Sequence, residues 1–175
     1  MRHKYLTRAV VLSRAGVRES GVLLTLLTEE LGLVRARAEG LRKPGAKLAS
    51  ALQTLSESDV TLVRGKETWR LAGALLVRDR FRELTPAART RAARFGGLLL
   101  RLVPHDSSDL GFYPLYMRFL ESLMTADEDA QDRAECLAAL SLLVMLGLDT
   151  GPVDETLARD ELIRRINRGI SASGL

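Results

Sequence analysis

The spacing of apolar residues changes near Asp79, and this change restricts the possible folds more than any other feature of the sequence. Before it, short runs rich in β-branched and aliphatic residues are separated by turns that contain Gly, Ser and Glu, which is typical of strands. After it, apolar residues recur every three or four positions, as on the buried face of a helix. The sequence therefore predicts an α+β fold in which all strands precede all helices.

Five strands are expected in the N-terminal part, over residues 7–14, 22–28, 34–38, 58–63 and 68–77. A flat sheet of this size would leave one face wet, whereas apolar residues such as Leu24 and Val60 need an interior. Five strands with short turns suit the OB-fold, a small closed barrel. We therefore predict a nucleic-acid-binding OB-fold barrel in residues 1–80 and an all-helical domain in residues 81–175.

Four helices are expected after the barrel, over residues 86–103, 113–123, 132–146 and 154–170. Thr85 is placed to cap the first helix, and Gly147 is placed to end the third. The Gly96-Gly97 pair costs roughly 1 kcal/mol per residue relative to Ala, and close approach of a neighbouring helix or strand is the usual compensation. On the last helix we expect four cations to face solvent, with contact to nucleic acid as the alternative: Arg159, Arg164, Arg165 and Arg168.

Positive charge is concentrated in residues 34–48. In the strand, Arg35 and Arg37 alternate with small or apolar residues, so both guanidinium groups leave from one face. The following loop contains two glycines and a proline, which oppose regular structure, and it adds the cations Arg42, Lys43 and Lys47. Such a face and loop suit the phosphate backbone of a nucleic acid. A solvated hairpin tip is the alternative.

Charge is also divided unevenly between the two halves of the chain. Residues 1–80 contain 15 Lys and Arg against 8 Asp and Glu, whereas residues 81–175 contain 11 against 14. A basic half joined to a mildly acidic half indicates that the first half meets a polyanion. Trp69, in the basic half, is expected to pack in the barrel core, with base stacking as the alternative.

The sequence argues against an enzyme, a bound metal and a cofactor. Residues 40–47 lack the Gly-Lys-Ser/Thr order that a nucleotide-binding P-loop requires. Cys136, expected to be a small core residue, and the two histidines are too few for a zinc cluster, and His105 is expected in an exposed linker. No Ser-His-Asp or Cys-His arrangement stands out. No apolar run approaches the roughly 20 residues that span a bilayer, so we expect a cytoplasmic protein.

Several short motifs occur in a characteristic order. They are residues 5–12, Glu19-Ser20, residues 23–28, Leu31-Gly32, Ala38-Glu39-Gly40, Arg42-Lys43-Pro44, Leu48, Ala51-Leu52-Gln53, Arg64-Gly65, residues 143–147 and Gly151-Pro152. Their order resembles the RecO family of recombination mediators over nearly the whole chain. Each motif is degenerate by itself, and the order carries the resemblance.

The resemblance implies an OB-fold followed by a helical domain in a non-enzymatic protein of the cytoplasm, associated with the nucleoid. Such a protein would bind single- and double-stranded DNA and anneal complementary strands. With a RecR-type partner it would help to load the RecA recombinase onto strands covered by single-stranded DNA-binding protein (SSB). The basic OB surface of the family corresponds here to Arg35, Arg37, Arg42, Lys43 and Lys47, with Arg14, Arg64, Lys66 and Arg70 as extensions.

Many members of the family carry a four-cysteine zinc module after the helical core. This chain has only Cys136 and passes from Gly151-Pro152 almost directly to a final helix, so it resembles a short form without that module. A groove for the acidic SSB tail would need apolar walls beside a cation, and the choices are Arg94, Arg101 and Arg118. Two other functions fit the same sequence: an OB-fold that binds structured RNA, and an interaction module whose helical half recruits a protein.

Overall fold

The computed structural model describes residues 3–17, 21–39, 49–66, 68–125 and 127–174. The chain divides into two compact units. The first contains Met1–Glu83 together with Pro104–Tyr113, and the second contains Leu84–Val103 and Pro114–Leu175. The domain boundary predicted after residue 80 stays a prediction. In the structure the chain also returns to the first unit at Pro104–Tyr113.

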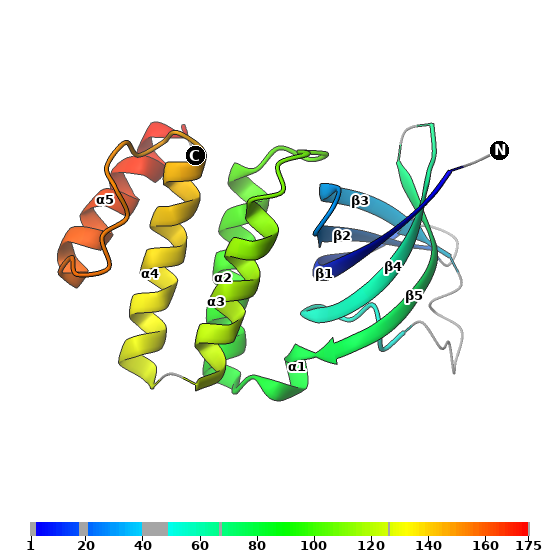
Figure 1. The fold of residues 1–175 in the computed structure, drawn as a ribbon, viewed down its shortest axis with the longest axis horizontal. Helices are drawn as coiled ribbons and strands as arrows, with labels where there is room; N and C mark the ends of the chain where they lie inside the picture. The colour runs from blue at the N-terminus through cyan, green and yellow to red at the C-terminus, as the bar shows by residue number, and fades with distance from the viewer. Residues whose placement is uncertain (1–2, 18–20, 40–48, 67, 126, 175) are drawn as a thin grey trace. The chain divides into compact units, whose positions relative to one another are not determined.

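The first unit is a closed five-stranded barrel of the OB-fold type, as predicted (Figure 1). The strands follow one another around it in the order β1-β2-β3-β5-β4. All neighbouring strands are antiparallel except β3 and β5, which run parallel and close the barrel. Each expected strand is present, and the bounds are β1 (Lys4–Gly16), β2 (Val22–Thr28), β3 (Gly32–Ala38), β4 (Ser56–Arg64) and β5 (Trp69–Asp79).

Side chains on β3 alternate between the barrel interior and the surface. On β3, Val34, Ala36 and Ala38 are buried, while Arg35 and Arg37 are exposed, as the sequence predicted. This strand therefore has one face inside the barrel and one in water. The inward residues form a single apolar cluster that includes Val11, Leu24, Leu26, Val60, Leu62 and Trp69.

The second unit contains helices. Some of them begin at other residues than predicted, because different residues cap them. α2 (Pro86–Leu102) begins as expected, and the Thr85 hydroxyl accepts the Ala88 N–H at 3.2 Å. α4 (Glu128–Met145) begins before the predicted Asp132 because Asp127 caps it, accepting the Ala130 N–H at 2.8 Å. The predicted start of this helix at residue 132 is therefore wrong.

The last helix also begins at a different residue. α5 (Arg159–Ala172) starts after Ala158 and not at Asp154. The Asp154 carboxylate instead accepts the Thr156 N–H at 2.8 Å, in a turn that precedes the helix. Two further helices are α3 (Phe112–Thr125) and a single turn, α1 (Arg80–Glu83), which was not predicted. Among the described residues no helix is long and apolar enough to cross a membrane.

Close approach of a neighbouring helix at Gly96 is confirmed. A Cβ at this position would lie 3.2 Å from the hydroxyl oxygen of Tyr116 on α3, and that hydroxyl donates to the Ala92 carbonyl at 3.1 Å. Phe95 stacks on the same tyrosine ring, with centroids 5.8 Å apart. α4 packs against both α2 and α5 in the same unit. Gly147 ends α4 with a positive φ of 70°, also as expected.

Candidate nucleic-acid interface

The parallel pairing of β3 with β5 places two predicted cations next to each other. Arg37 on β3 and Arg70 on β5 are Cα partners, and both side chains are exposed. The pairing itself consists of Ala36 with Trp69 and Arg37 with Arg70. Like charges directly opposite one another on strands are destabilising. Closure of the barrel therefore brings two positively charged residues together, and a bound anion would reduce the repulsion between them.

The turn between β4 and β5 brings two more predicted cations to the same place. Gly65 donates its N–H to the Thr68 carbonyl at 3.0 Å, and a Cβ on Gly65 would collide with that carbonyl. The turn is thereby held tight, with Arg64 and Lys66 exposed on it. One hollow of about 350 Å³ is lined by Val63, Arg64, Gly65, Lys66 and Arg70.

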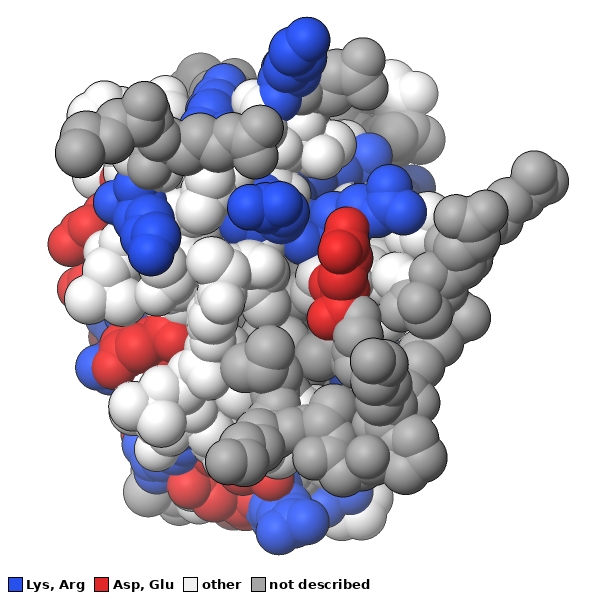
Figure 2. Space-filling view, turned by 90° about the vertical axis from the view of Figure 1, so that its right-hand side faces the viewer, with Lys and Arg blue, Asp and Glu red and all other residues white. Residues whose placement is uncertain are grey.

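A second hollow of about 340 Å³ adjoins the first, and Arg37, Gly65, Lys66, Thr68, Trp69 and Arg70 line it. Because the two hollows share Lys66 and Arg70, four of the predicted cations form one surface. We call Arg37, Arg64, Lys66 and Arg70 the cation cluster. Figure 2 shows a face of the molecule on which Lys and Arg side chains gather with few acidic side chains among them.

The other predicted site residues that the structure describes do not line the two hollows of the cation cluster. Arg35 is exposed on β3 two residues before Arg37, and its guanidinium contacts the Nε2 atom of His105. Arg14 is exposed on β1 opposite Leu24 of β2, so a whole strand separates it from β3. Arg42, Lys43 and Lys47 lie outside the described residues.

The contact between Arg35 and His105 shows what local patterns could not predict. The segment expected to be an exposed linker lies against the barrel, since Leu33 donates its N–H to the Ser107 carbonyl at 2.9 Å. Gly32 permits this approach because a Cβ there would collide with the same carbonyl. A glycine at a strand start is a weak signal, and nothing in the sequence of Pro104–Tyr113 names its partner.

Trp69 is a core residue, as expected, with 6 % of its surface exposed. The Tyr5 ring meets it edge-on, with centroids 5.2 Å apart. The Arg64 guanidinium carbon lies over the indole, 4.8 Å from the ring centroid, in a cation–π contact. Trp69 therefore joins the barrel core to the cation cluster through Arg64.

Most of the cations on α5 are paired within the second unit and do not form a free basic face. Arg159 bonds Asp132 at 2.6 Å, Arg164 bonds Glu161, and Arg165 bonds Asp149. Only 11 % of the Arg165 side chain is exposed, so its predicted position in solvent is wrong. These arginines bind carboxylates of their own unit, which reduces their availability to a phosphate.

Charge-assisted hydrogen bonds control the acid–base behaviour of these carboxylates. The Arg159 guanidinium lowers the pKa of Asp132, and the Arg165 guanidinium lowers the pKa of Asp149. Close by, burial and then the Asp132 charge raise the pKa of the Cys136 thiol. This thiol is only half-buried and lines a hollow, so the prediction of a small core residue is wrong.

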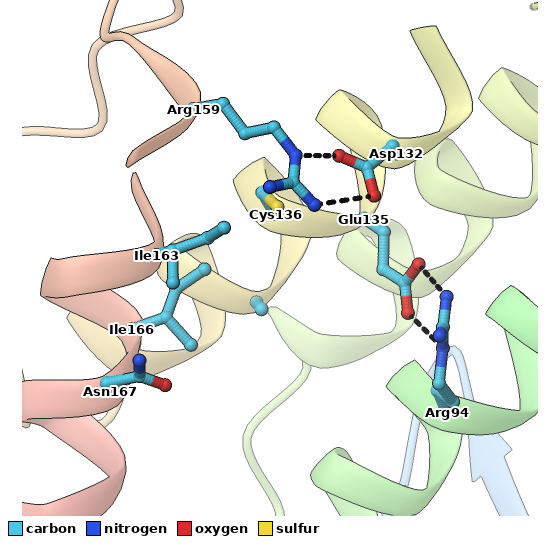
Figure 3. A pocket seen from close by; sticks show the side chains of 9 residues that line it. Arg94, Asp132, Glu135, Cys136, Arg159, Ile163, Ile166 and Asn167 are labelled. Carbon is cyan, nitrogen blue, oxygen red and sulfur yellow. Dashed lines mark hydrogen bonds and ion pairs between the residues drawn. The ribbon is translucent and has the colours of Figure 1, made fainter. Parts of the chain in front are cut away.

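Figure 3 shows this hollow, of about 290 Å³, between α4 and α5. Its cations are already bound to carboxylates, because Arg94 contacts Glu135 at 2.7 and 2.8 Å and Arg159 contacts Asp132. Its apolar floor includes Cys136, Ala139, Ile163 and Ile166.

A second hollow of the helical unit, of about 270 Å³, has a different character. Its lining is mainly apolar and includes Leu115, Phe119, Leu137 and Val153, together with the charged residues Arg118 and Glu155. Arg118 is exposed, and within the described part of the chain no carboxylate pairs with it. Arg101, the third choice from the sequence, is exposed near the end of α2.

Comparison with known proteins gives a consistent result. Residues 1–79 match the family described as "Recombination protein O N terminal". The chain is 28% identical over 123 residues to the DNA repair protein RecO of Dehalococcoides mccartyi, covering 69% of this chain and 48% of that protein. It is 33% identical over 145 residues to the DNA repair protein RecO of Heliobacterium modesticaldum, covering 82% of this chain and 51% of that protein.

The chain thus spans about half the length of the curated relatives that it matches. The family match coincides with the barrel, and the longer alignments extend beyond it into the helices. The order of motifs in the sequence, the OB-fold barrel and these relatives all lead to one assignment. The chain belongs to the RecO family.

Proposed function

We propose that this chain binds single- and double-stranded DNA through the cation cluster and serves DNA repair and recombination. In this role it anneals complementary strands and, together with a RecR-type partner, assists loading of the RecA recombinase onto SSB-covered DNA. The pairing of Arg37 with Arg70 carries the proposal. Two arginines at directly paired positions, both exposed, favour an anionic ligand with closely spaced charges, such as a phosphate backbone.

The proposed mechanism is electrostatic. Each phosphate that the cluster neutralises releases condensed counterions, so affinity falls steeply with salt. Aromatic side chains contribute little to stacking, because Trp69 is buried and Tyr5 packs against it. Strands held mainly through their phosphates keep their bases free to pair. Two such strands, with their mutual repulsion screened by the cluster, can anneal.

The test compares two triple variants with the same change in net charge. Arg37→Gln/Lys66→Gln/Arg70→Gln removes cations of the cluster, whereas the control, Arg82→Gln/Arg101→Gln/Arg168→Gln, removes exposed cations elsewhere. Binding of a fluorescent single-stranded oligonucleotide is measured at several salt concentrations. If three phosphate contacts are lost, the slope of log K against log salt falls by about 2 in the first variant only. Strand annealing is then measured with the same proteins.

Equal slopes in the wild type and both variants would overturn the proposal. A matched RNA bound more tightly than DNA, with the same dependence on the cluster, would support the structured-RNA alternative. Weak binding that does not depend on salt, together with retained binding to a partner protein, would support the interaction-module alternative.

For the acidic SSB tail, we propose the hollow beside Arg118 and not the hollow beside Arg94. The tail needs apolar contacts and a cation that is free to meet a carboxylate. Arg94 is already bound to Glu135 by two hydrogen bonds. Arg118 is exposed and lines a hollow together with the apolar side chains of Leu115 and Phe119.

Binding of an SSB-tail peptide tests this choice. Arg118→Glu is expected to lower the affinity for the peptide tenfold or more, since it replaces an electrostatic attraction by a repulsion. Arg94→Glu is the matched control on the other hollow, and it is expected to lower stability more than affinity. Loss of peptide binding in Arg94→Glu alone would reverse the assignment.

A further inference from the structure

A third hollow of the barrel unit, of about 190 Å³, differs in chemistry from the two that the cation cluster lines. It lies between the turn before β3, the end of β4, the start of β5 and the segment Pro104–Tyr113. Its walls include Leu31, Val34 and Trp69, and its polar groups include Glu30, Arg64 and Asp106. An apolar cavity with a few convergent polar groups is the usual form of a site for a small organic group.

The walls of this hollow are held in place by the backbone. The hydrogen bond from the Leu33 N–H to the Ser107 carbonyl fastens the segment Pro104–Tyr113 to the first residues of β3. Asp106 adopts a left-handed conformation with φ of 63°, which is uncommon outside glycine and recurs at ligand sites. The Asp106 carboxylate is thus presented from a fixed turn.

Arg64 supplies a flat surface inside the hollow. Its guanidinium carbon lies 4.8 Å from the centroid of the Trp69 ring, and the exposed side chain is accessible to a second planar group. Trp69 is 6 % exposed, and an incoming ring therefore meets the guanidinium more than the indole. Nucleobases stack on arginine guanidinium planes in this way.

Glu30 and Asp106 decide what kind of group enters. Carboxylates repel a phosphate but accept hydrogen bonds, so the hollow suits a base and not the backbone. Within the described part of the chain, neither carboxylate has an ion pair or a side-chain hydrogen bond to occupy it. Cytosine, adenine and guanine carry amino groups that donate to carboxylates. Thymine offers a single N–H between two carbonyl oxygens, which the carboxylates repel.

We propose that this hollow binds one amino-bearing nucleobase of a single strand whose phosphates lie on the cation cluster. The inference rests on the proposed function and adds to it a base preference. Arg64 lines both this hollow and the first hollow of the cluster, and Trp69 lines both this hollow and the second. A strand on the cluster therefore passes the mouth of the base site.

The experiment uses the full chain and two homopolymers of equal length, oligo-dC and oligo-dT, at neutral pH. Trp69 is the only tryptophan, so intrinsic fluorescence reports directly on the wall of the hollow. Oligo-dC is expected to bind about tenfold more tightly than oligo-dT, the value of one hydrogen bond to a charged group. Oligo-dC is also expected to change the tryptophan emission more than oligo-dT does at saturation.

Two variants and one control isolate the carboxylates. Glu30→Ala removes one carboxylate at an exposed turn, and Asp106→Asn neutralises the other while keeping a residue that tolerates a left-handed backbone. Removing a negative charge raises affinity for every oligonucleotide, so the readout is the ratio of dC to dT affinity. The double variant is expected to bring this ratio close to one. Glu29→Ala, the matched control next to Glu30, is expected to leave it unchanged.

The outcomes separate the two proposals. If neither homopolymer binds in a salt-dependent way, the proposed function fails, and the base site fails with it. If both bind with a steep salt slope but equally well, and the tryptophan emission does not differ between them, the base site is overturned while the proposed function stands. A dC preference that survives in the double variant also overturns the assignment to Glu30 and Asp106.

Discussion

Arg37 and Arg70 are Cα partners across the parallel pairing that closes the barrel, although they lie far apart in the sequence. Both side chains are exposed, and each adds to the other's electrostatic potential. Folding alone gains nothing from this arrangement, because like charges opposite one another on strands are unfavourable. The pair therefore lowers the stability of the fold while it favours binding of an anionic ligand.

Replacing one of these arginines is expected to raise stability and to weaken DNA binding. Arg70→Gln removes the repulsion and should raise the free energy of unfolding by about 0.2–1 kcal/mol. The same change should weaken binding of single-stranded DNA and lower its salt slope by about 0.7. Thermal unfolding and salt titration measure the two effects. Arg14→Gln is the control, since Arg14 is opposite Leu24 and no like charge is relieved; a stabilisation equal to that of Arg70→Gln would contradict the prediction.

A buried ion pair fastens α1 to β4 in the same unit. The Arg80 guanidinium donates to the Glu57 carboxylate at 2.9 and 3.0 Å, and only 3 % of the Arg80 side chain is exposed. Glu57→Gln removes the negative charge that this buried guanidinium contacts and is expected to cost about 3 kcal/mol. Chemical denaturation measures the loss.

The neighbouring carboxylate on the same strand is the control for Glu57. Asp59 pairs with Arg8 at 2.6 Å, but about a third of each side chain is exposed. Asp59→Asn is expected to cost about 1 kcal/mol or less, because water already screens the pair. Equal losses in the two variants would show that burial does not decide the strength of these pairs.

The two adjacent glycines of α2 are expected to respond differently to the same substitution. At Gly97 an added Cβ meets no atom within 4 Å, so Gly97→Ala should stabilise the protein by about 1 kcal/mol through helix propensity. At Gly96 the added Cβ lies 3.2 Å from the hydroxyl oxygen of Tyr116, which is fully buried. Gly96→Ala should gain less or destabilise. Thermal unfolding of the two variants provides the comparison, and a larger gain at Gly96 would refute it.

The helical unit is expected to lose stability in acid. Arg159 and Arg165 lower the pKa values of Asp132 and Asp149, so the folded state binds these protons less readily than the unfolded chain does. Their contribution to stability is complete above the unfolded pKa of about 4, and it is lost as the pH falls through the lower folded values. The melting temperature should therefore decline below about pH 4.

Variants of the Asp149–Arg165 pair measure how much this pair contributes to the decline of the melting temperature in acid. Asp149→Asn and Arg165→Gln should each lower the melting temperature at neutral pH and flatten its dependence on acid. The double variant should behave as either single variant does, because all three lack the same interaction. An unchanged acid dependence in Asp149→Asn would remove this pair from the explanation.

Local sequence determined those features that depend on nearest neighbours along the chain. The alternation of Arg35 and Arg37 with buried residues follows from the two-residue period of a strand. The positions of the five strands were predictable from runs of β-branched and aliphatic residues separated by turn residues. The start of α2 at Thr85 and the end of α4 at Gly147 were predictable because capping depends on residues within one turn. The motif order was sufficient to indicate the RecO family.

Tertiary structure decided everything that depends on which distant segments meet. No local pattern states that β5 pairs with β3, and only this pairing brings Arg70 beside Arg37. Likewise, the return of Pro104–Tyr113 to the barrel places Asp106 near Arg64. Three of the four α5 cations are exposed as expected, whereas Arg165 is not, because its partner Asp149 comes from a segment outside α5. Sequence periodicity specifies which face of an element is buried, whereas packing and strand register specify what that element meets.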